Sequence, residues 1–339
     1  MRRISRSRST IALMGIVVTV LGLSIVASLV PDSSYLRFQL LNNKNIIDAR
    51  WIYERIHFDD RPIDVLFVGA SNIKYGISAD RMENNFSHRG LSVKIENFAA
   101  LFGGRNLNYV LMKEMYKAGR QPKLLVLGVF GRPAHFGHPA FKYFADASDI
   151  VAPIYLVNLD YLSDLQYLPF RQLKLAAMRL FPHAFEASLK FDPILYTERE
   201  KDPAGLVQNA RSGMLIGRDK KLSGATFLKE AESLNFWEKP TLPSALADVE
   251  FGDEKYYIPR IVALARAHKT KVVFVYIPNF QGPPKALFEN FYLHYGPVFN
   301  ANLVANNDQI FFDSGHLNRK GALAVTDWLT NQIADMLGD

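Results

Sequence analysis

One serine, one aspartate and one histidine have the types and the sequence positions needed for a nucleophile with its base. Ser71 follows the apolar run "IDVLFVGA", and Asp313 precedes His316 by three positions in "FFDSGHLN". A serine hydroxyl attacks a carbonyl well only when an imidazole takes its proton, and a carboxylate must hold that imidazole in the correct tautomer. The three residues therefore have the composition of a nucleophile, a general base and an orienting carboxylate. Taken singly, Ser71 is more simply explained as a helix cap or turn residue.

Short apolar runs alternate with helix-like segments around these residues. Strands are expected at 63–71, 92–99, 123–130, 271–278 and 309–313. Helices are expected at 78–90, 104–122, 254–268 and after 316, with Ser78 as an N-cap and Gly90 as a stop. Continuous apolar strands separated by helices predict an α/β fold, with a doubly wound, mainly parallel sheet covered on both faces.

The carboxyl ends of such strands meet at one rim of the sheet, where ligand sites form. Ser71, the stretch "NFAALFGG" and the Asp313–His316 pair are all expected at that rim. A sharp turn before Ser71 leaves its backbone amide free to face a developing oxyanion. Gly103 or Gly104 is expected to bring a second amide to the same place.

Residues 11–30 form a run of twenty residues without a charge, which is about the length needed to cross a bilayer as a helix. The arginine-rich residues 1–10 should remain in the cytoplasm, which places the rest of the chain outside the inner membrane, in the periplasm or extracellular space. A cleaved secretory signal is the alternative, but the apolar run is longer than the usual signal core of about 7–15 residues.

Composition excludes several classes of function. The formal charge is +7, but four of these charges are arginines in the first ten residues, so no nucleic-acid partner is expected. The chain contains no cysteine, which excludes disulfides, thiolate metal sites and lipoprotein attachment. No cofactor is expected either.

The order of elements suggests five segments. They are a basic tail (1–10), a transmembrane anchor (11–30), a juxtamembrane helix (31–60), a catalytic domain in two pieces (61–130 and 251–339) and a middle section (131–250). The middle section is rich in aromatic residues and prolines, and we expect a largely helical insertion or cap. The alternative is a long excursion that packs on the sheet edge without a role in the site.

Three stretches of the chain resemble the SGNH (GDSL-like) hydrolases. They are "VLFVGASN", "NFAALFGG" and "FDSGHLNRKG". The resemblance implies a flavodoxin-like three-layer sandwich and a catalytic Ser71, Asp313 and His316, with Gly103 in the oxyanion hole. It covers about residues 60–130 and 250–336 and does not reach the middle section.

One motif departs from this family. The third strand should end in Gly-x-Asn-Asp, whose asparagine donates to the oxyanion, but this chain has Phe130 at that position. Loss of one such donor costs about 10²- to 10³-fold in turnover. Asn72 and Asn106 are the candidate replacements.

The anchor and the missing asparagine together resemble one branch of the family, the alginate O-acetylation proteins and the D-alanyl transfer protein. The resemblance implies a membrane-bound O-acyltransferase as the source of the acyl group and a cell-surface polysaccharide or polymer as the acceptor. A membrane-tethered esterase and a non-catalytic polymer-binding scaffold are the alternatives.

Four further residues are weaker candidates. Arg105 and Arg132 follow strand ends and are candidates for binding an anionic polymer, although solvated or ion-paired arginines are more common. His135 and His138 have a spacing that can bind metal on a helix, but a glycine between them and flanking prolines favour a loop. A structural or substrate-lining role is therefore favoured for these histidines, and no metal site is expected.

Overall fold

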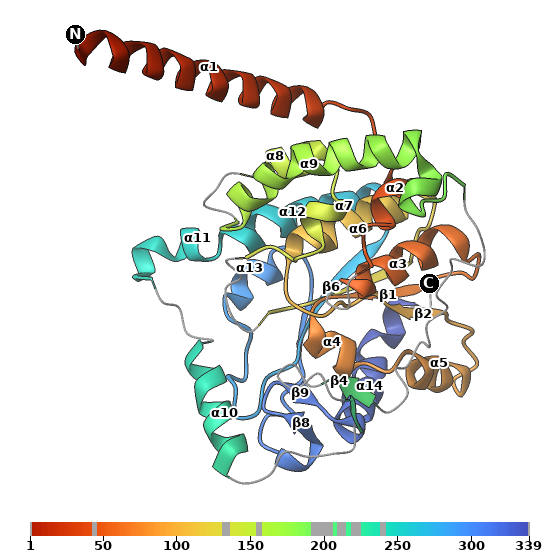
Figure 1. Ribbon diagram of the computed structural model, residues 1–339. Coiled ribbons are helices and arrows are strands. Elements are labelled where there is room, and N and C mark those ends of the chain that lie inside the picture. The colour runs from red at the N-terminus through yellow and green to blue at the C-terminus, as the bar shows by residue number, and fades with distance from the viewer. Residues whose placement is uncertain are drawn as a thin grey trace.

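A computed structural model describes most of the chain (Figure 1). The described residues are 2–42, 46–130, 136–153, 158–190, 206–208, 215–217, 225–237 and 242–337. Predictions that concern Arg132 and His135 lie outside these residues.

Five strands form one parallel sheet in the order β2-β1-β3-β6-β7. Their bounds are β1 Val65–Val68, β2 Ile95–Asn97, β3 Leu124–Gly128, β6 Lys271–Tyr276 and β7 Val298–Asn300. β1, β3 and β6 are apolar runs whose residues are almost all buried, as expected for strands covered on both faces. The predicted α/β class with a parallel sheet is therefore confirmed.

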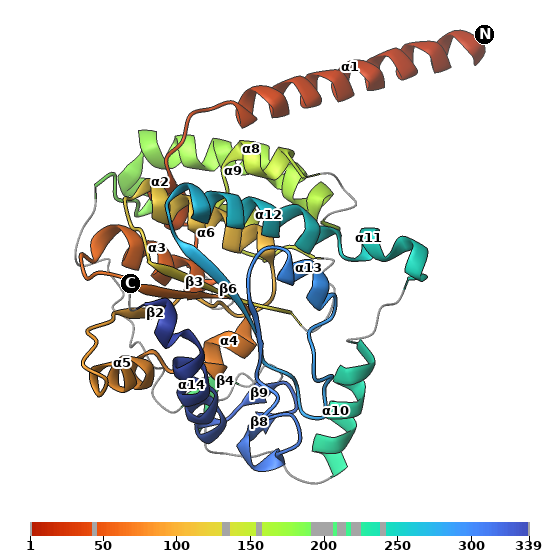
Figure 2. The same ribbon diagram turned by 180° about the vertical axis from the view of Figure 1, so that it is seen from behind.

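Alternate residues of the central strands pack into two separate cores. Leu66 and Val68 pack with the apolar faces of α3 (Ile47–Phe58), α6 (Arg105–Lys117) and α12 (Gly252–Ala267). Val65 and Phe67 pack on the other face of the sheet with α4 (Ser71–Gly76), α5 (Ala79–Ser87) and α14 (Arg319–Ile333). Figures 1 and 2 show these two helix layers on opposite sides of the sheet.

Local signals set the ends of α5 as predicted, and a cap that was not predicted begins α14. The Ser78 hydroxyl accepts from the backbone amide of Arg81 at the start of α5, and Gly90 follows the helix with a φ of 77°. Asn318 caps α14 in the same way by accepting from Gly321. These caps supply acceptors for amides that have none inside the helix.

The strand expected at 309–313 does not join the main sheet. β8 (Phe311–Asp313) pairs antiparallel with β9 (His316–Leu317) in a separate two-stranded sheet. The fifth strand of the main sheet is β7, which has no strong apolar run and was not predicted. The expectation that Asp313 ends a strand of the main sheet is therefore wrong, although Asp313 still reaches the site.

The described parts of residues 131–250 contain mainly helices. They are α7 Phe141–Phe144, α8 Ala147–Val151, α9 Tyr161–Leu180, α10 Ala225–Trp237 and α11 Ala247–Glu250, with short 3₁₀ turns and the hairpin β4 Leu206–Gln208 and β5 Leu215–Gly217. α9 packs on α2 (Ser34–Phe38) and α7, whereas Phe227 and Ala231 of α10 join the core that contains α4 and α14. α13 (Glu289–Leu293) precedes β7.

At the N-terminal end of the described chain, α1 (Arg2–Ser28) projects from the rest of the structure (Figure 1). Within it, Ser9–Ser28 is the one helix of the described residues that is long and apolar enough to cross a membrane, with a mean hydropathy of 2.5. Its apolar side chains are exposed, apart from Ala27 near its end.

Candidate active site

Ser71 stands at the first position of α4, directly after the end of β1. The chain passes through Gly69, where a side chain would meet Ile73 Cγ1 at 2.7 Å and the Gly128 backbone at 3.4 Å. Ala70 is extended and lets the chain turn into the helix. The first amides of a helix have no acceptor within it, so the amide of Ser71 is available to a ligand.

Asp313 and His316 form a close pair across the turn between β8 and β9. His316 Nδ1 lies 2.8 and 2.9 Å from the two carboxylate oxygens of Asp313. The Gly315 amide donates to the same carboxylate at 2.9 Å, which holds it in place. Because an ionised carboxylate can only accept, Nδ1 carries the proton and Nε2 is free to accept.

His316 Nε2 lies 2.7 Å from Ser71 Oγ, across 245 positions of sequence. The hydroxyl therefore donates to the imidazole, which in turn donates to Asp313. The structure thus brings together the three residues singled out in the sequence, in the geometry of a nucleophile, a base and an orienting carboxylate.

Asp313 and His316 each shift the pKa of the other towards its charged form. Burial alone would lower the pKa of His316, but the charge of Asp313 and the hydrogen bond to it outweigh burial and raise this pKa above its usual value. Burial would raise the pKa of Asp313, but His316 and two backbone amides lower it overall. Asp313 therefore remains ionised and favours the imidazolium that forms when His316 takes a proton.

The loop that precedes α6 and contains Gly103 and Gly104, here called the glycine loop, is held by buried polar groups. The Leu101 amide donates to Asp48, which also accepts from Lys74, and the Leu101 carbonyl lies 2.7 Å from Nε2 of His138. Phe102 has a φ of 67°, an uncommon conformation for an aromatic residue. Such a strained, braced loop is typical of a functional site.

Gly103 and Gly104 complete the loop but have different surroundings. Gly103 is exposed, and a side chain there would meet only the Phe130 ring, at 3.7 Å or more. Gly104 is buried, and a side chain there would meet the backbone nitrogen and Cβ of His138 at 2.5 Å. Gly103 is therefore the more accessible of the two to a ligand.

Phe130 takes the position where the resembled family has an asparagine. Its ring is 8% exposed, contacts Gly103 and lies 4.1 Å below the guanidinium of Arg105. The side chain offers no hydrogen-bond donor, so the chemistry of this position is apolar.

The two asparagines suggested as replacement donors have different surroundings. Asn106 is fully buried, and its side-chain oxygen accepts from the amides of Leu107 and His138. The prediction is wrong for Asn106, because Nδ2, the donor that it requires, is buried beside Gly137 without a hydrogen-bond partner in the described part of the chain. The oxygen of Asn72 accepts from the Ile73 amide within α4.

Arg105 does not bind a polymer through its side chain. It is fully buried, donates from Nε to Glu254 at 2.8 and 2.9 Å, and donates from Nη2 to the Gly128 carbonyl at 2.6 Å. The prediction of substrate binding is therefore wrong for Arg105, because a buried carboxylate takes up its charge.

His138 has a structural position. Its ring is buried with Nε2 against the Leu101 carbonyl, and its Nδ1 accepts from the Ala140 amide at 3.0 Å. Burial lowers its pKa to about 4, although the bond to Leu101 acts in the opposite direction. Within the described ranges, no group of three or more histidine and acidic side chains could hold a metal ion.

Two features of the site were missed in the sequence. The Tyr75 ring meets His316 edge-on, with 5.5 Å between ring centroids. The Asp48–Lys74 pair braces the glycine loop from α3 and α4. Lys74 and Tyr75 lie in the same stretch as Ser71, "GASNIKYG", but nothing in that stretch indicated their partners.

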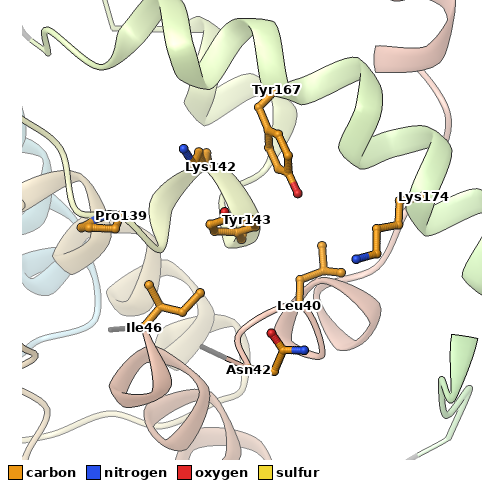
Figure 3. Close-up of a pocket in the computed structure, with 8 residues that line it drawn as sticks. All are labelled: Leu40, Asn42, Ile46, Pro139, Lys142, Tyr143, Tyr167 and Lys174. Atoms are coloured by element: carbon orange, nitrogen blue, oxygen red, sulfur yellow. The ribbon is translucent and has the colours of Figure 1, made fainter. Parts of the chain in front are cut away.

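A pocket of about 280 Å³ lies elsewhere, between α9, α7 and the chain after α2 (Figure 3). It is lined by Leu40, Asn42, Ile46, Pro139, Lys142, Tyr143, Tyr167 and Lys174. None of these residues belongs to the Ser71 site, so this pocket is separate from it.

No protein-family model matches this chain, and no curated protein matches it.

Proposed function

We propose that this chain is an extracytoplasmic serine acyltransferase that moves an acyl group, in the simplest case acetyl, onto a hydroxyl of a cell-surface polysaccharide or polymer. The observation that carries the proposal is the continuous arrangement from Ser71 Oγ through His316 to the Asp313 carboxylate. The family-like stretches around these residues support an SGNH-type, doubly wound fold in which residues 131–250 are an insertion.

The proposed reaction has two half-reactions. Ser71 Oγ attacks the acyl carbonyl while His316 Nε2 takes its proton, and the same proton then goes to the leaving group as the acyl-serine forms. The acceptor hydroxyl next gives its proton to His316 and attacks the acyl-serine carbonyl. Collapse returns that proton to Ser71 and releases the ester product.

The amides of Ser71 and Gly103 would stabilise the oxyanion in both steps. Phe130 withholds the third donor expected from the family, which corresponds to about 10²- to 10³-fold in turnover. A weaker oxyanion hole slows acylation, hydrolysis and transfer alike, so the preference for an acceptor hydroxyl over water must come from the groups that cover the site.

Transfer requires that the acceptor hydroxyl outcompete water at the acyl-serine. α10 supports this requirement, because Leu234 lies against Gly315, where a side chain would meet its Cδ1 at 3.3 Å. Part of the middle section therefore packs on the turn that carries Asp313 and His316.

We further propose that residues 11–30 anchor the chain in the cytoplasmic membrane. The arginines before them would remain inside, and the domain that follows would lie in the periplasm or outside the cell. A membrane-bound O-acyltransferase is the proposed source of the acyl group. The length and hydropathy of Ser9–Ser28 support the anchor.

A trapped acyl-serine tests the proposal. The full-length chain in lipid nanodiscs is incubated with an activated acetyl ester, and intact mass is followed for the native chain, Ser71→Ala and Ser87→Ala. Ser87 is an exposed serine at the end of α5, so its substitution is a matched control. We expect one acetyl adduct in the native chain and in Ser87→Ala, and none in Ser71→Ala.

The fate of the adduct distinguishes the alternatives. Faster loss when a glycan with free hydroxyls is added indicates transfer, whereas rapid loss to water alone indicates an esterase. Phe130 favours a second candidate, a non-catalytic polymer-binding scaffold. That candidate requires no adduct from any donor, including a co-reconstituted membrane acyltransferase, together with polymer binding that survives Ser71→Ala.

A further inference from the structure

α9 has two apolar faces, and only one of them is covered by the protein. The buried face packs towards α2, α7 and the end of α1 through Leu168, Gln172, Leu175 and Met178. The opposite face carries large apolar side chains at helical spacing, and Phe181 continues it. We call this exposed set the α9 stripe: Leu162, Leu165, Phe170, Leu173, Leu180 and Phe181.

The α9 stripe is unusually open for a helix of a folded domain. Phe170 is 66% exposed and Leu180 is 72% exposed. Gln166, also exposed, lies between Leu162 and Phe170, so the surface is mainly rather than wholly apolar. Exposed apolar side chains gathered in this way mark a contact with another molecule or with a membrane. α1 does not cover the stripe, because its own apolar side chains are exposed over nearly their whole length.

The end of the apolar helix α1 is bonded directly to α9. Gln172 Nε2 donates to the Val30 carbonyl at 2.9 Å, and Arg171 Nη2 lies 3.9 Å from the Asp32 carboxylate. α1 ends at Ser28, and the two residues from there to Val30 can span at most about 7 Å. The membrane surface where α1 emerges must therefore lie beside α9.

We propose that the α9 stripe lies in the surface of the bilayer, as an interfacial helix next to the point where α1 leaves the membrane. The inference rests on the proposed membrane anchor and goes beyond it. Interfacial helices bury their apolar face about 5–10 Å into the headgroup and acyl boundary. Arg179 is exposed in the last turn of the same helix, where its long side chain can reach anionic headgroups.

A lipid surface fits the stripe better than a soluble protein partner for a geometric reason. A soluble partner would have to fit between the stripe and a bilayer that the linker keeps at most a few residues away, whereas a membrane-embedded partner would leave the stripe unquenched by lipid. Lipid is already there, and it covers the apolar side chains of α1 and α9 together. Transfer of each large apolar side chain from water to lipid favours this contact.

This contact would fix how the domain stands on the membrane. In Figures 1 and 2, α9 lies at the end of the molecule next to α1, whereas β8, β9 and α10 lie at the opposite end. The turn that carries Asp313 and His316 is therefore held away from the lipid. An acceptor polymer outside the membrane can approach that end without crossing the headgroups.

Single cysteines test the contact, because the chain has none of its own. Phe170→Cys, Val18→Cys and Ser87→Cys are made in the full chain, labelled with an environment-sensitive fluorophore and reconstituted in nanodiscs of zwitterionic and anionic lipid. Quenching by spin-labelled lipid is compared with quenching by iodide in the water phase. Leu173→Cys serves as a second stripe position if Phe170→Cys does not fold.

We expect the labels at Val18 and at the stripe to be quenched several-fold more by spin-labelled lipid than the label at Ser87, and to be protected from iodide. If spin-labelled lipid quenches the label at Val18 but quenches the stripe label no more than the label at Ser87, the contact between the stripe and the membrane is rejected and the membrane anchor is kept. A stripe protected from iodide but not quenched by lipid would mean that protein covers it, which also overturns the contact. Absence of lipid quenching at Val18 would reject the anchor and the contact together.

Discussion

Replacement of Asp313 by asparagine should remove the function of the base while preserving the shape of the site. Asp313 accepts from His316 Nδ1 at 2.8 and 2.9 Å and from the Gly315 amide at 2.9 Å. An asparagine amide can donate to Nδ1, which moves the imidazole proton to Nε2. That nitrogen lies 2.7 Å from Ser71 Oγ and, once protonated, can no longer accept the serine proton.

The expected loss is about 10⁴-fold in the rate of acylation, the scale of a histidine held in the wrong tautomer. This corresponds to about 5 kcal/mol of activation free energy, at about 1.4 kcal/mol for each factor of ten. A fall of this size from a change of one oxygen to one NH₂ group cannot come from lost packing, because the side chain keeps its volume.

The pH profile should change in a direction that identifies the cause. In the native chain Asp313 raises the pKa of His316 above 6.5, against the effect of burial. The neutral imidazole is the base, so acylation should rise with pH through a midpoint above 6.5. In Asp313→Asn the opposing effect of burial remains, so the midpoint should move below 6.5.

The assay is the rate of acetyl adduct formation on Ser71 under single-turnover conditions, measured by intact mass over a range of pH. Asp327→Asn is the matched control, since Asp327 is also an ion-paired carboxylate but lies on α14, bonded to Arg81. The reasoning is refuted if the two variants acylate at equal rates, or if the midpoint of Asp313→Asn stays above 6.5.

Three further predictions concern stability and the surroundings of the site. Gly104→Ala should lower the free energy of unfolding by about 1–3 kcal/mol, because its Cβ would meet the backbone at 2.5 Å. Gly103→Ala is the control, since its Cβ makes only ordinary contacts. Thermal unfolding compares the two variants, and equal melting temperatures would contradict the prediction. Arg105→Met should lower the free energy of unfolding by about 3–5 kcal/mol, because it leaves the buried Glu254 carboxylate unpaired. Adding Glu254→Gln should recover much of that loss in denaturant titrations, and a double variant no more stable than Arg105→Met would argue against the pair. Burial, with the charge of Asp160 as a smaller cause, raises the pKa of Asp164 to about 7 in the folded chain, whereas the pKa of an unfolded aspartate is about 4. The free energy of unfolding should therefore fall as the pH rises from about 4 to about 7. Asp164→Asn should flatten this part of the profile of stability against pH, and an unchanged slope would count against the prediction.

Much of the sheet could be predicted because its strands are continuous apolar runs. β1, β3 and β6 are buried on both faces, so their composition alone separates them from the polar segments between them. Ser78 was predicted as a helix start because its capping is local and needs no distant partner. The uncharged run of α1 was evident for the same reason.

Pairing between strands could not be read in the same way. β8 ends in Asp313 and looked like a further strand of the main sheet, but it pairs with β9, which begins three positions later. β7 lies at the sheet edge with half-buried residues and no apolar pattern. Which strand pairs with which depends on contacts made after the chain has folded back, and local composition carries little of that information.

The sequence by itself determined which residue types were available for chemistry, the local turns that present them and the length of an apolar helix. Only the tertiary structure decided their partners. It brings Ser71 to His316 across 245 positions, buries Arg105 against Glu254 and packs the Phe130 ring under Gly103. The physical reason is that a side chain's charge, proton and exposure depend on its neighbours in space, and those neighbours lie far away along the chain.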